Sequence, residues 1–283
     1  MTAHAFLVPG EMLKGLKAGA RIRLDGAEAH HAVKVLRVRV GESVLITDRG
    51  GSQARATVDT VGKQHLEVIL ADSSRTAVPR TPQLVLVQAL ARQGRDERAV
   101  ETATELGVDR IVPWQASRCV VRWNGEKARK GLMKWQATID SAVKQSRRLT
   151  IPALGDPVDM SGLIQLVEDS RAQGGLTLVL HESADASIGE VFTELAAADG
   201  VTAQTSGQIV MSSISVVVGP EGGITPDEVA ALAVAGARVV QLGPEILRAS
   251  TAGPAVLAAL SAAVGRWGGT DQFRHDHADA AAM

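Results

Sequence analysis

The sequence predicts an α/β protein whose mainly parallel sheet follows a small β-rich domain. Short alternating segments separated by glycine turns fill residues 1–72. From residue 83 onward, apolar runs alternate with helical segments. Two of these runs, 214–218 and 239–242, each stop in a turn rich in glycine and proline. A chain of 283 residues is long enough for two domains.

The first domain is expected to be a compact barrel of short strands. The strands are predicted at 21–24, 43–48, 53–58 and 66–70, with one helix at 28–38. That helix ends in a basic patch of Lys34, Arg37 and Arg39. Residues 73–82 are polar and bounded by prolines, so they are predicted to be a linker.

The second domain, residues 83–267, is predicted to alternate strands with helices, in the order typical of a parallel sheet covered on both faces. Strands are expected at 84–90, 111–114, 176–180, 214–218 and 239–242, and helices at 98–106, 125–148, 226–236 and 251–264. Residues 184–213 are small and polar and predict a poorly specified insertion. Residues 268–283 are expected to be a disordered tail.

Charge is unevenly distributed along the chain. The first 150 residues hold 25 Lys and Arg against 15 Asp and Glu, and the other 133 hold 5 against 16. A basic half predicts a surface that faces a polyanion, although a chance distribution of solvated charges is the alternative. The single cysteine, Cys119, excludes a disulfide framework, and the histidines lack metal-ligand spacing. No run of 18 apolar residues occurs, so we expect a cytoplasmic protein without a membrane span.

Several common site motifs are missing. No G-x-G-x-x-G follows a strand, no G-x-x-x-x-G-K-[ST] occurs and no G-x-S-x-G is present. These absences disfavour a conventional dinucleotide fingerprint, a P-loop nucleotidase and a hydrolase nucleophile elbow.

The two glycine turns predict a ligand crevice at the carboxyl edge of the sheet. The first is Gly219-Pro220-Glu221-Gly222-Gly223, and the second is Leu242-Gly243-Pro244-Glu245-Ile246-Leu247-Arg248. Open α/β sheets bind ligands at this edge. Glycines without a Cβ let main-chain groups approach a ligand, although plain turn formation is the alternative explanation.

These motifs resemble the RsmE family of 16S ribosomal RNA uridine N3-methyltransferases in the SPOUT superfamily. Three further segments agree in order, namely 103–113, 145–148 and 178–182, and the stretch from His30 to Arg37 is similar to the family's PUA-like RNA-binding domain. The resemblance covers residues 5–266. It implies a C-terminal trefoil knot, a PUA-like barrel, S-adenosyl-L-methionine as cofactor and the small ribosomal subunit as partner. It also implies a homodimer, with the final helix as a candidate interface, although this helix could instead simply pack on the sheet.

The resemblance also assigns roles to residues. For the cofactor it implies Leu180, His181, Glu182, Gly219, Pro220, Glu221, Gly222, Leu242, Gly243, Ile246, Leu247 and Arg248. As catalytic candidates, Arg248 would stabilise the uridine anion and Glu221 would accept the N3 proton. Alternatively, Arg248 binds a phosphate or forms a dimer salt bridge, and Glu221 caps a helix or accepts loop amides. RNA contacts are expected from Lys34, Arg37, Arg39, Arg118, Arg122, Arg147 and Arg148.

The chain departs from the family pattern at several positions. Glu245 stands where the family has arginine, Ser250 stands where it has glutamate, and a lysine after the first strand is replaced within Arg92–Arg95. Two alternatives therefore stay open. One is a SPOUT ribose 2′-O-methyltransferase, although the asparagine-bearing third motif of that group is missing. The other is a non-catalytic ribosome-assembly factor.

Overall fold

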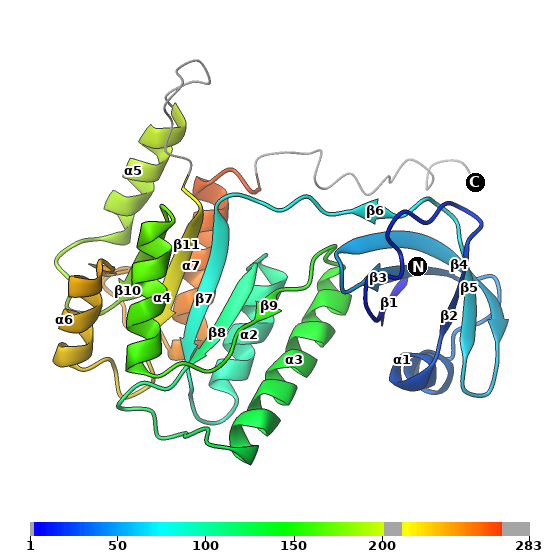
Figure 1. The fold of residues 1–283 in the computed structure, drawn as a ribbon, viewed down its shortest axis with the longest axis horizontal. Coiled ribbons are helices and arrows are strands. Elements are labelled where there is room, and N and C mark those ends of the chain that lie inside the picture. The colour runs from blue at the N-terminus through cyan, green and yellow to red at the C-terminus, as the bar shows by residue number, and fades with distance from the viewer. Residues whose placement is uncertain (1–2, 201–210, 268–283) are drawn as a thin grey trace. The chain divides into compact units, whose positions relative to one another are not determined.

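The computed structural model describes residues 3–200 and 211–267 and divides into two compact units (Figure 1). The first unit contains residues 3–80, 100–105 and 129–154, and the second contains 81–99, 106–128, 155–200 and 211–267. Each unit therefore combines segments that are far apart in the sequence. The domain boundaries that we expect at residues 72 and 83 stay a prediction. The tail expected at 268–283 lies outside the described residues.

The N-terminal sheet has the strand order β1-β3-β4-β5-β2, with β6 paired to β4. Its strands are β1 (His4–Val8), β2 (Arg21–Leu24), β3 (Ser43–Asp48), β4 (Ser52–Val61), β5 (Leu66–Leu70) and β6 (Arg75–Thr76). The four predicted strands are confirmed, while β1, which pairs with β3 in parallel, was not predicted. Alternating side chains from these strands bury an apolar core that includes Phe6, Ile46 and Leu66. A small β-rich N-terminal fold is therefore confirmed.

The single helix predicted at 28–38 is divided into two segments. Helix α1 (Gly26–His30) runs directly into a π-helical segment, η1 (His31–Leu36). Arg37 then takes a left-handed conformation with φ of 54°, which ends the segment. Arg39 therefore lies outside the helical segments.

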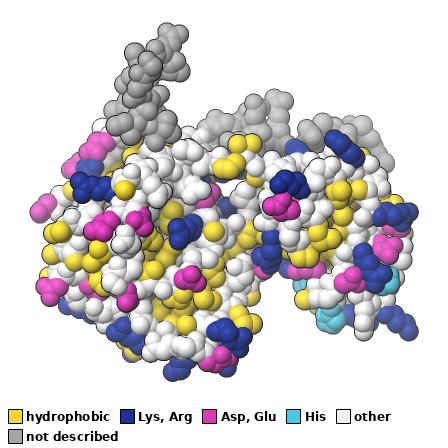
Figure 2. Space-filling view, in the orientation of Figure 1, with side chains coloured by type: hydrophobic (Ala, Val, Ile, Leu, Met, Phe, Trp, Pro, Cys, Tyr) yellow, Lys and Arg dark blue, Asp and Glu magenta, His cyan; other side chains and the backbone are white. Residues whose placement is uncertain are grey.

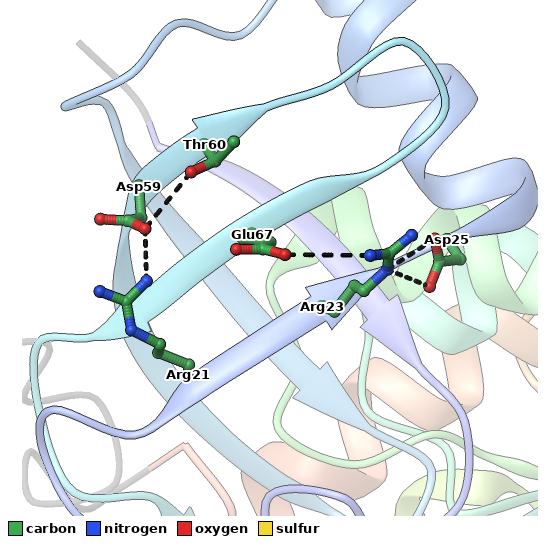
Figure 3. Close-up of polar contacts among 6 residues, drawn as sticks. All are labelled: Arg21, Arg23, Asp25, Asp59, Thr60 and Glu67. Atoms are coloured by element: carbon green, nitrogen blue, oxygen red, sulfur yellow. Dashed lines mark hydrogen bonds and ion pairs between the residues drawn. The ribbon is translucent and has the colours of Figure 1, made fainter.

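Figure 3 shows two arginines of β2 in ion pairs within the N-terminal sheet. Arg21 lies 2.5 Å from Asp59 of β4, and Arg23 lies 3.0 Å from Asp25 and 3.9 Å from Glu67 of β5. Because these pairs are exposed, water and salt screen them, and they contribute little to stability. Their main consequence is that these two arginines are already neutralised.

The basic helix predicted at 125–148 is confirmed as α3 (Glu126–Ser146) and is followed by the short β9 (Ala153–Leu154). Most of α3 belongs to the first unit. Asp140 lies 2.5 Å from Arg49, and Lys144 lies 2.7 Å from Glu28. These two ion pairs connect α3 to the N-terminal residues of the same unit.

In the second unit five parallel strands lie in the order β12-β10-β11-β7-β8. They are β7 (Gln83–Ala89), β8 (Arg110–Trp114), β10 (Leu176–Leu180), β11 (Ser213–Val218) and β12 (Arg238–Val240). Continuous apolar runs form β7 and β11, as expected for strands that are covered on both faces. The predicted parallel α/β fold is confirmed. The trefoil knot stays a prediction.

Helices cover both faces of this sheet, with α4 and α6 in contact on one face and α5 and α7 on the other (Figure 1). The helices are α2 (Arg95–Glu105), α4 (Met160–Ala172), α5 (Ile188–Gly200), α6 (Pro226–Ala235) and α7 (Ala249–Ala263). Helices α4 and α5 were not predicted, and α5 begins inside the stretch that we interpreted as an insertion. None of the described helices has the length and hydropathy that crossing a membrane requires.

Close packing of α7 on the sheet sets the position of its N-terminus. A Cβ added to Gly253 would lie 2.7 Å from Leu86 of β7 and 3.2 Å from Val218 of β11. Beyond the far end of the helix, the buried Arg266 pairs with Asp109 at 2.5 Å and donates to the Pro82 carbonyl. With both ends fixed, the first turn of α7 lies at the carboxyl edge of β11.

Candidate functional site

A cavity of about 850 Å³ lies where the predicted crevice should be, at the carboxyl ends of β10, β11 and β12. The loops that follow these three strands, together with the first turn of α7, form its walls. All twelve residues expected to bind the cofactor line it, namely Leu180, His181, Glu182, Gly219, Pro220, Glu221, Gly222, Leu242, Gly243, Ile246, Leu247 and Arg248. The structure therefore brings these twelve candidates together in one place.

The loop Gly219–Gly223, here called the glycine loop, leads directly into α6. Thr225 caps the helix through a capping box with Glu228, and Pro226 occupies the first turn. Within the loop the Gly223 amide donates to the Pro220 carbonyl at 2.9 Å, and Gly223 has a φ of +74°. This tight turn points the loop main chain at the cavity.

Gly219, Gly222 and Gly243 differ in the space that is available for a side chain. A Cβ on Gly219 would lie 2.7 Å from the Ile224 side chain, and one on Gly222 would lie 3.1 Å from the Cβ of Arg118. These two positions are therefore explained by packing within the protein. On Gly243, by contrast, a Cβ would meet only a Glu245 oxygen at 3.6 Å, so its free side is open to a ligand.

Glu221 connects the glycine loop to the start of α2. One carboxylate oxygen accepts the Arg92 amide at 3.0 Å and the Arg95 guanidinium at 2.9 Å. Burial raises the pKa of the Glu221 carboxyl, but hydrogen bonds from its own amide, the Arg92 amide and Arg95 outweigh burial and bring the pKa below the ordinary value. The predicted capping of α6 belongs to Thr225 and Glu228, whereas Glu221 accepts a loop amide.

Arg248 stands immediately before α7 and is exposed. Within residues 3–200 and 211–267 its side chain makes no hydrogen bond or ion pair, so its charge is available to a ligand. The N-terminus of α7 has no side-chain cap. The Thr251 amide already donates to the Arg248 carbonyl at 2.8 Å, so the amides of Ala249 and Ser250 are the donors that this N-terminus can offer to an anionic group.

Two arginines that line the cavity were not assigned to it from the sequence. Arg95 was noted only as part of a departure from the family pattern, and Arg118 was assigned to RNA. Arg118 donates to the Gly222 carbonyl at 3.0 Å. Both residues follow strands, β7 and β8, whose carboxyl ends meet the same sheet edge, and this topological signal could have placed them.

The other residues expected to bind RNA fall into two groups. In the first group the arginines donate to main-chain carbonyl groups. Arg122 donates to those of Ala116 and Ser117. Arg147 donates to that of Ala3, and Arg148 donates to that of Thr104. Lys34, Arg37 and Arg39 are exposed around η1, and among the described residues their side chains have no acidic partner. On the face in Figure 2, basic and acidic side chains are interspersed rather than separated. Lys34, Arg37 and Arg39 are thus the free cations of the N-terminal candidates.

Within the described part of the chain, no group of three or more His, Cys, Asp or Glu side chains could hold a metal ion. Cys119 is buried, and burial raises the pKa of its thiol to about 11.

Comparison with known proteins agrees with this fold. A family model described as an RNA methyltransferase domain matches residues 79–261, and one described as an RNA methyltransferase PUA domain matches residues 24–71. The chain is 41% identical over 250 residues to ribosomal RNA small subunit methyltransferase E of Mycobacterium bovis, covering 88% of this chain and 89% of the relative. It is 28% identical to the protein of that name from Bacillus subtilis, covering 84% and 88%.

The fold also matches a solved structure. Ribosomal RNA small subunit methyltransferase E of Neisseria gonorrhoeae, bound to S-adenosyl methionine, superposes with a TM-score of 0.73 at 26% identity. The match covers 92% of this chain and 98% of that one. Fold, cavity and matches together define an RNA methyltransferase. More specifically, the chain belongs to the RsmE family of ribosomal RNA small subunit methyltransferases.

Proposed function

We propose that this protein transfers a methyl group from S-adenosyl-L-methionine to N3 of one uridine in 16S ribosomal RNA. The observation that carries the proposal is the single cavity that gathers all twelve expected cofactor residues at the carboxyl edge of a parallel sheet. The Neisseria relative, which is bound to S-adenosyl methionine, supports the choice of cofactor. The specificity for uridine N3 rests on the family resemblance.

The residues present fit such a cofactor. Leu180, Leu242 and Leu247 supply apolar walls for an adenine ring, and the open side of Gly243 admits close approach to the main chain. The uncapped N-terminus of α7 offers amide donors to a carboxylate. When bound, the cofactor supplies an activated methyl group, so the contribution of the protein is mainly to position the reactants.

Uridine N3 carries a proton at neutral pH and must lose it before the nitrogen can attack. Arg248 is our candidate for stabilising the resulting anion, because its guanidinium lines the cavity and is free of acidic partners among the described residues. Glu221 is less suited to accept the proton, since its pKa is lowered and its carboxylate already accepts two hydrogen bonds. We therefore propose that Glu221 acts as a positioning residue.

The partners and location follow from the proposed reaction. We propose that the chain acts as a homodimer, because Ile246, 80% exposed, and Leu247, 37% exposed, leave an apolar surface beside the cavity that a second copy could cover. RNA contacts would include Lys34, Arg37 and Arg39. An enzyme that modifies ribosomal RNA acts where ribosomal subunits are found, so we propose a cytoplasmic location.

The test of the catalytic proposal is Arg248→Ala, with Arg248→Lys as the partial replacement. Loss of the guanidinium should lower kcat by at least about a hundredfold while cofactor and RNA affinities change little, because the charge matters most as the anion forms. Lysine should restore part of the rate. Normal turnover at saturation with weakened RNA binding would instead assign Arg248 to a phosphate contact.

The alternatives make different predictions. An assembly factor without an intact pocket would fail to bind S-adenosyl-L-methionine in an equilibrium titration. A ribose methyltransferase would bind it and label RNA, but would leave the Watson–Crick edge of the base free.

A further inference from the structure

The loop that follows β8 is fixed firmly beside the glycine loop. The Ser117 amide donates to the buried carboxylate of Glu228 at 2.8 Å. Arg122 donates to the carbonyls of Ala116 and Ser117 at 3.2 and 2.7 Å. These three bonds hold the main chain on either side of Ser117, so the next residue, Arg118, leaves the loop from a defined position.

Arg118 is in direct contact with Gly222. Its guanidinium donates to the Gly222 carbonyl at 3.0 Å. A Cβ on residue 222 would lie 3.1 Å from the Arg118 Cβ and 3.3 Å from the Arg118 carbonyl oxygen. Neither atom is the far end of a flexible side chain, so only glycine accepts this approach without displacement. Gly222 is therefore explained by the docking of Arg118.

This docking leaves most of the Arg118 guanidinium unused. An arginine has five N–H donors, and the contact with Gly222 uses one of them. Among residues 3–200 and 211–267 no carboxylate pairs with Arg118, which is exposed and lines the cavity. The neighbouring Arg95 differs, because Glu221 neutralises it at 2.9 Å. Arg118 is thus an uncompensated cation on this wall of the cavity.

We propose that Arg118 binds a backbone phosphate of the RNA and couples that contact to the glycine loop; the inference rests on the proposed function. A guanidinium matches a phosphate with two parallel donors. Arg118 comes from none of the three loops that hold the cofactor candidates, and it is exposed, so a large ligand that arrives from solvent can reach it. A phosphodiester fits these features better than the cofactor carboxylate does.

The contact has an energetic consequence for cofactor binding. A phosphate held by Arg118 restrains the side chain that also restrains Gly222, so RNA binding should order the loop against which the cofactor packs. Ordering by one ligand lowers the cost of binding the second, and the effect is reciprocal. RNA should therefore raise the cofactor affinity of the wild type by about fivefold or more.

The experiment compares the wild type with Arg118→Ala, Arg118→Lys and the control Arg238→Ala. Arg238 is an arginine of the same unit that pairs with Glu194 away from the cavity. Affinity for small ribosomal subunits that lack the modification is measured over a series of monovalent salt concentrations at fixed Mg²⁺. Affinity for S-adenosyl-L-methionine is measured with and without those subunits.

Arg118→Ala should weaken RNA binding roughly tenfold at low salt and reduce the salt slope by about 0.7–0.9, the value of one phosphate contact. It should also remove the cofactor coupling. Arg118→Lys should keep the slope but weaken the coupling, because an ammonium lacks the planar fork that presents two parallel donors to a phosphate while a further donor reaches the Gly222 carbonyl. Arg238→Ala should keep both the salt slope and the coupling of the wild type.

An unchanged salt slope in Arg118→Ala would overturn the proposal. So would a loss of cofactor affinity in the absence of RNA with the slope retained, since that result would assign Arg118 to the cofactor carboxylate. A wild type that binds RNA but neither binds nor uses the cofactor would refute the proposed function instead. In that case the difference in salt slope between the wild type and Arg118→Ala would still show whether Arg118 contacts a phosphate.

Discussion

At the scale of single residues, the glycines of the two turns that line the cavity are needed for different physical reasons. Gly219 and Gly222 accommodate neighbours inside the protein, Gly223 supplies a left-handed turn, and Gly243 leaves an open edge. The sequence could not separate these reasons, because each depends on which segment from elsewhere in the chain arrives at the glycine. Their shared position in one ligand crevice, by contrast, followed directly from two apolar strands that end in glycine turns.

This distinction predicts different results for Gly243→Ala and Gly219→Ala. At Gly243 alanine meets no close atom, so unfolding free energy should stay the same or rise by up to about 1 kcal/mol, while cofactor affinity falls roughly tenfold. At Gly219 the contact with Ile224 should cost about 1–3 kcal/mol of stability. Urea unfolding and cofactor titration measure both quantities. Unchanged cofactor affinity in Gly243→Ala would favour plain turn formation there.

Glu221 gives a second prediction at the scale of the residue. Glu221→Gln removes the charge that holds Arg95, so cofactor KM should rise several-fold while kcat falls less. Since the carboxyl pKa is lowered, Glu221 stays ionised near neutral pH, and the pH profile of kcat should keep its shape in the variant. A loss of a hundredfold or more in kcat, together with a missing ionisation in the profile, would make Glu221 the base after all.

At the scale of elements, Glu228 connects a helix cap to the site. Its carboxylate accepts the Thr225 amide at 2.9 Å within the capping box and the Ser117 amide at 2.8 Å. The helix predicted at 226–236 is confirmed by α6, but the contact of Glu228 with Ser117 joins residues 111 positions apart. The residues around 225–228 therefore predicted where α6 begins, but they could not predict that Glu228 also accepts the Ser117 amide.

Glu228→Gln should lower the unfolding free energy at pH 7 by about 2 kcal/mol, because an amide group would face buried N–H donors. Burial raises the pKa of Glu228, but hydrogen bonds from Ser117 and Thr225 outweigh it and lower the pKa below 4.5. The stabilisation is thus fully present above pH 4.5 and is lost as pH falls through the lowered value. Urea unfolding from pH 7 to about pH 3 should show the two proteins converge. The exposed control, Asp227→Asn, should change stability by less than about 0.5 kcal/mol.

At the scale of the whole molecule, the sequence predicted most strands of the sheets. It did not predict which distant segments of the chain contact one another. Runs such as Leu84–Leu90 and Ile214–Val218 are apolar along their length and identify buried parallel strands. Helix α5 was missed because its small residues resemble a loop in composition, and β1 was missed because its pairing with β3 is non-local. Arg147 and Arg148 look basic and RNA-binding in sequence, yet both donate to carbonyls brought near by folding.

Reverse transcription of the product RNA shows whether this protein methylates N3 of one uridine. Small subunits lacking the modification are incubated with the wild-type protein and labelled S-adenosyl-L-methionine, and the RNA is then copied. Methylation at uridine N3 blocks the Watson–Crick edge, so the account predicts label incorporation with a single new stop at one uridine of 16S ribosomal RNA. Label incorporated with no such stop, or no label at all, would contradict it.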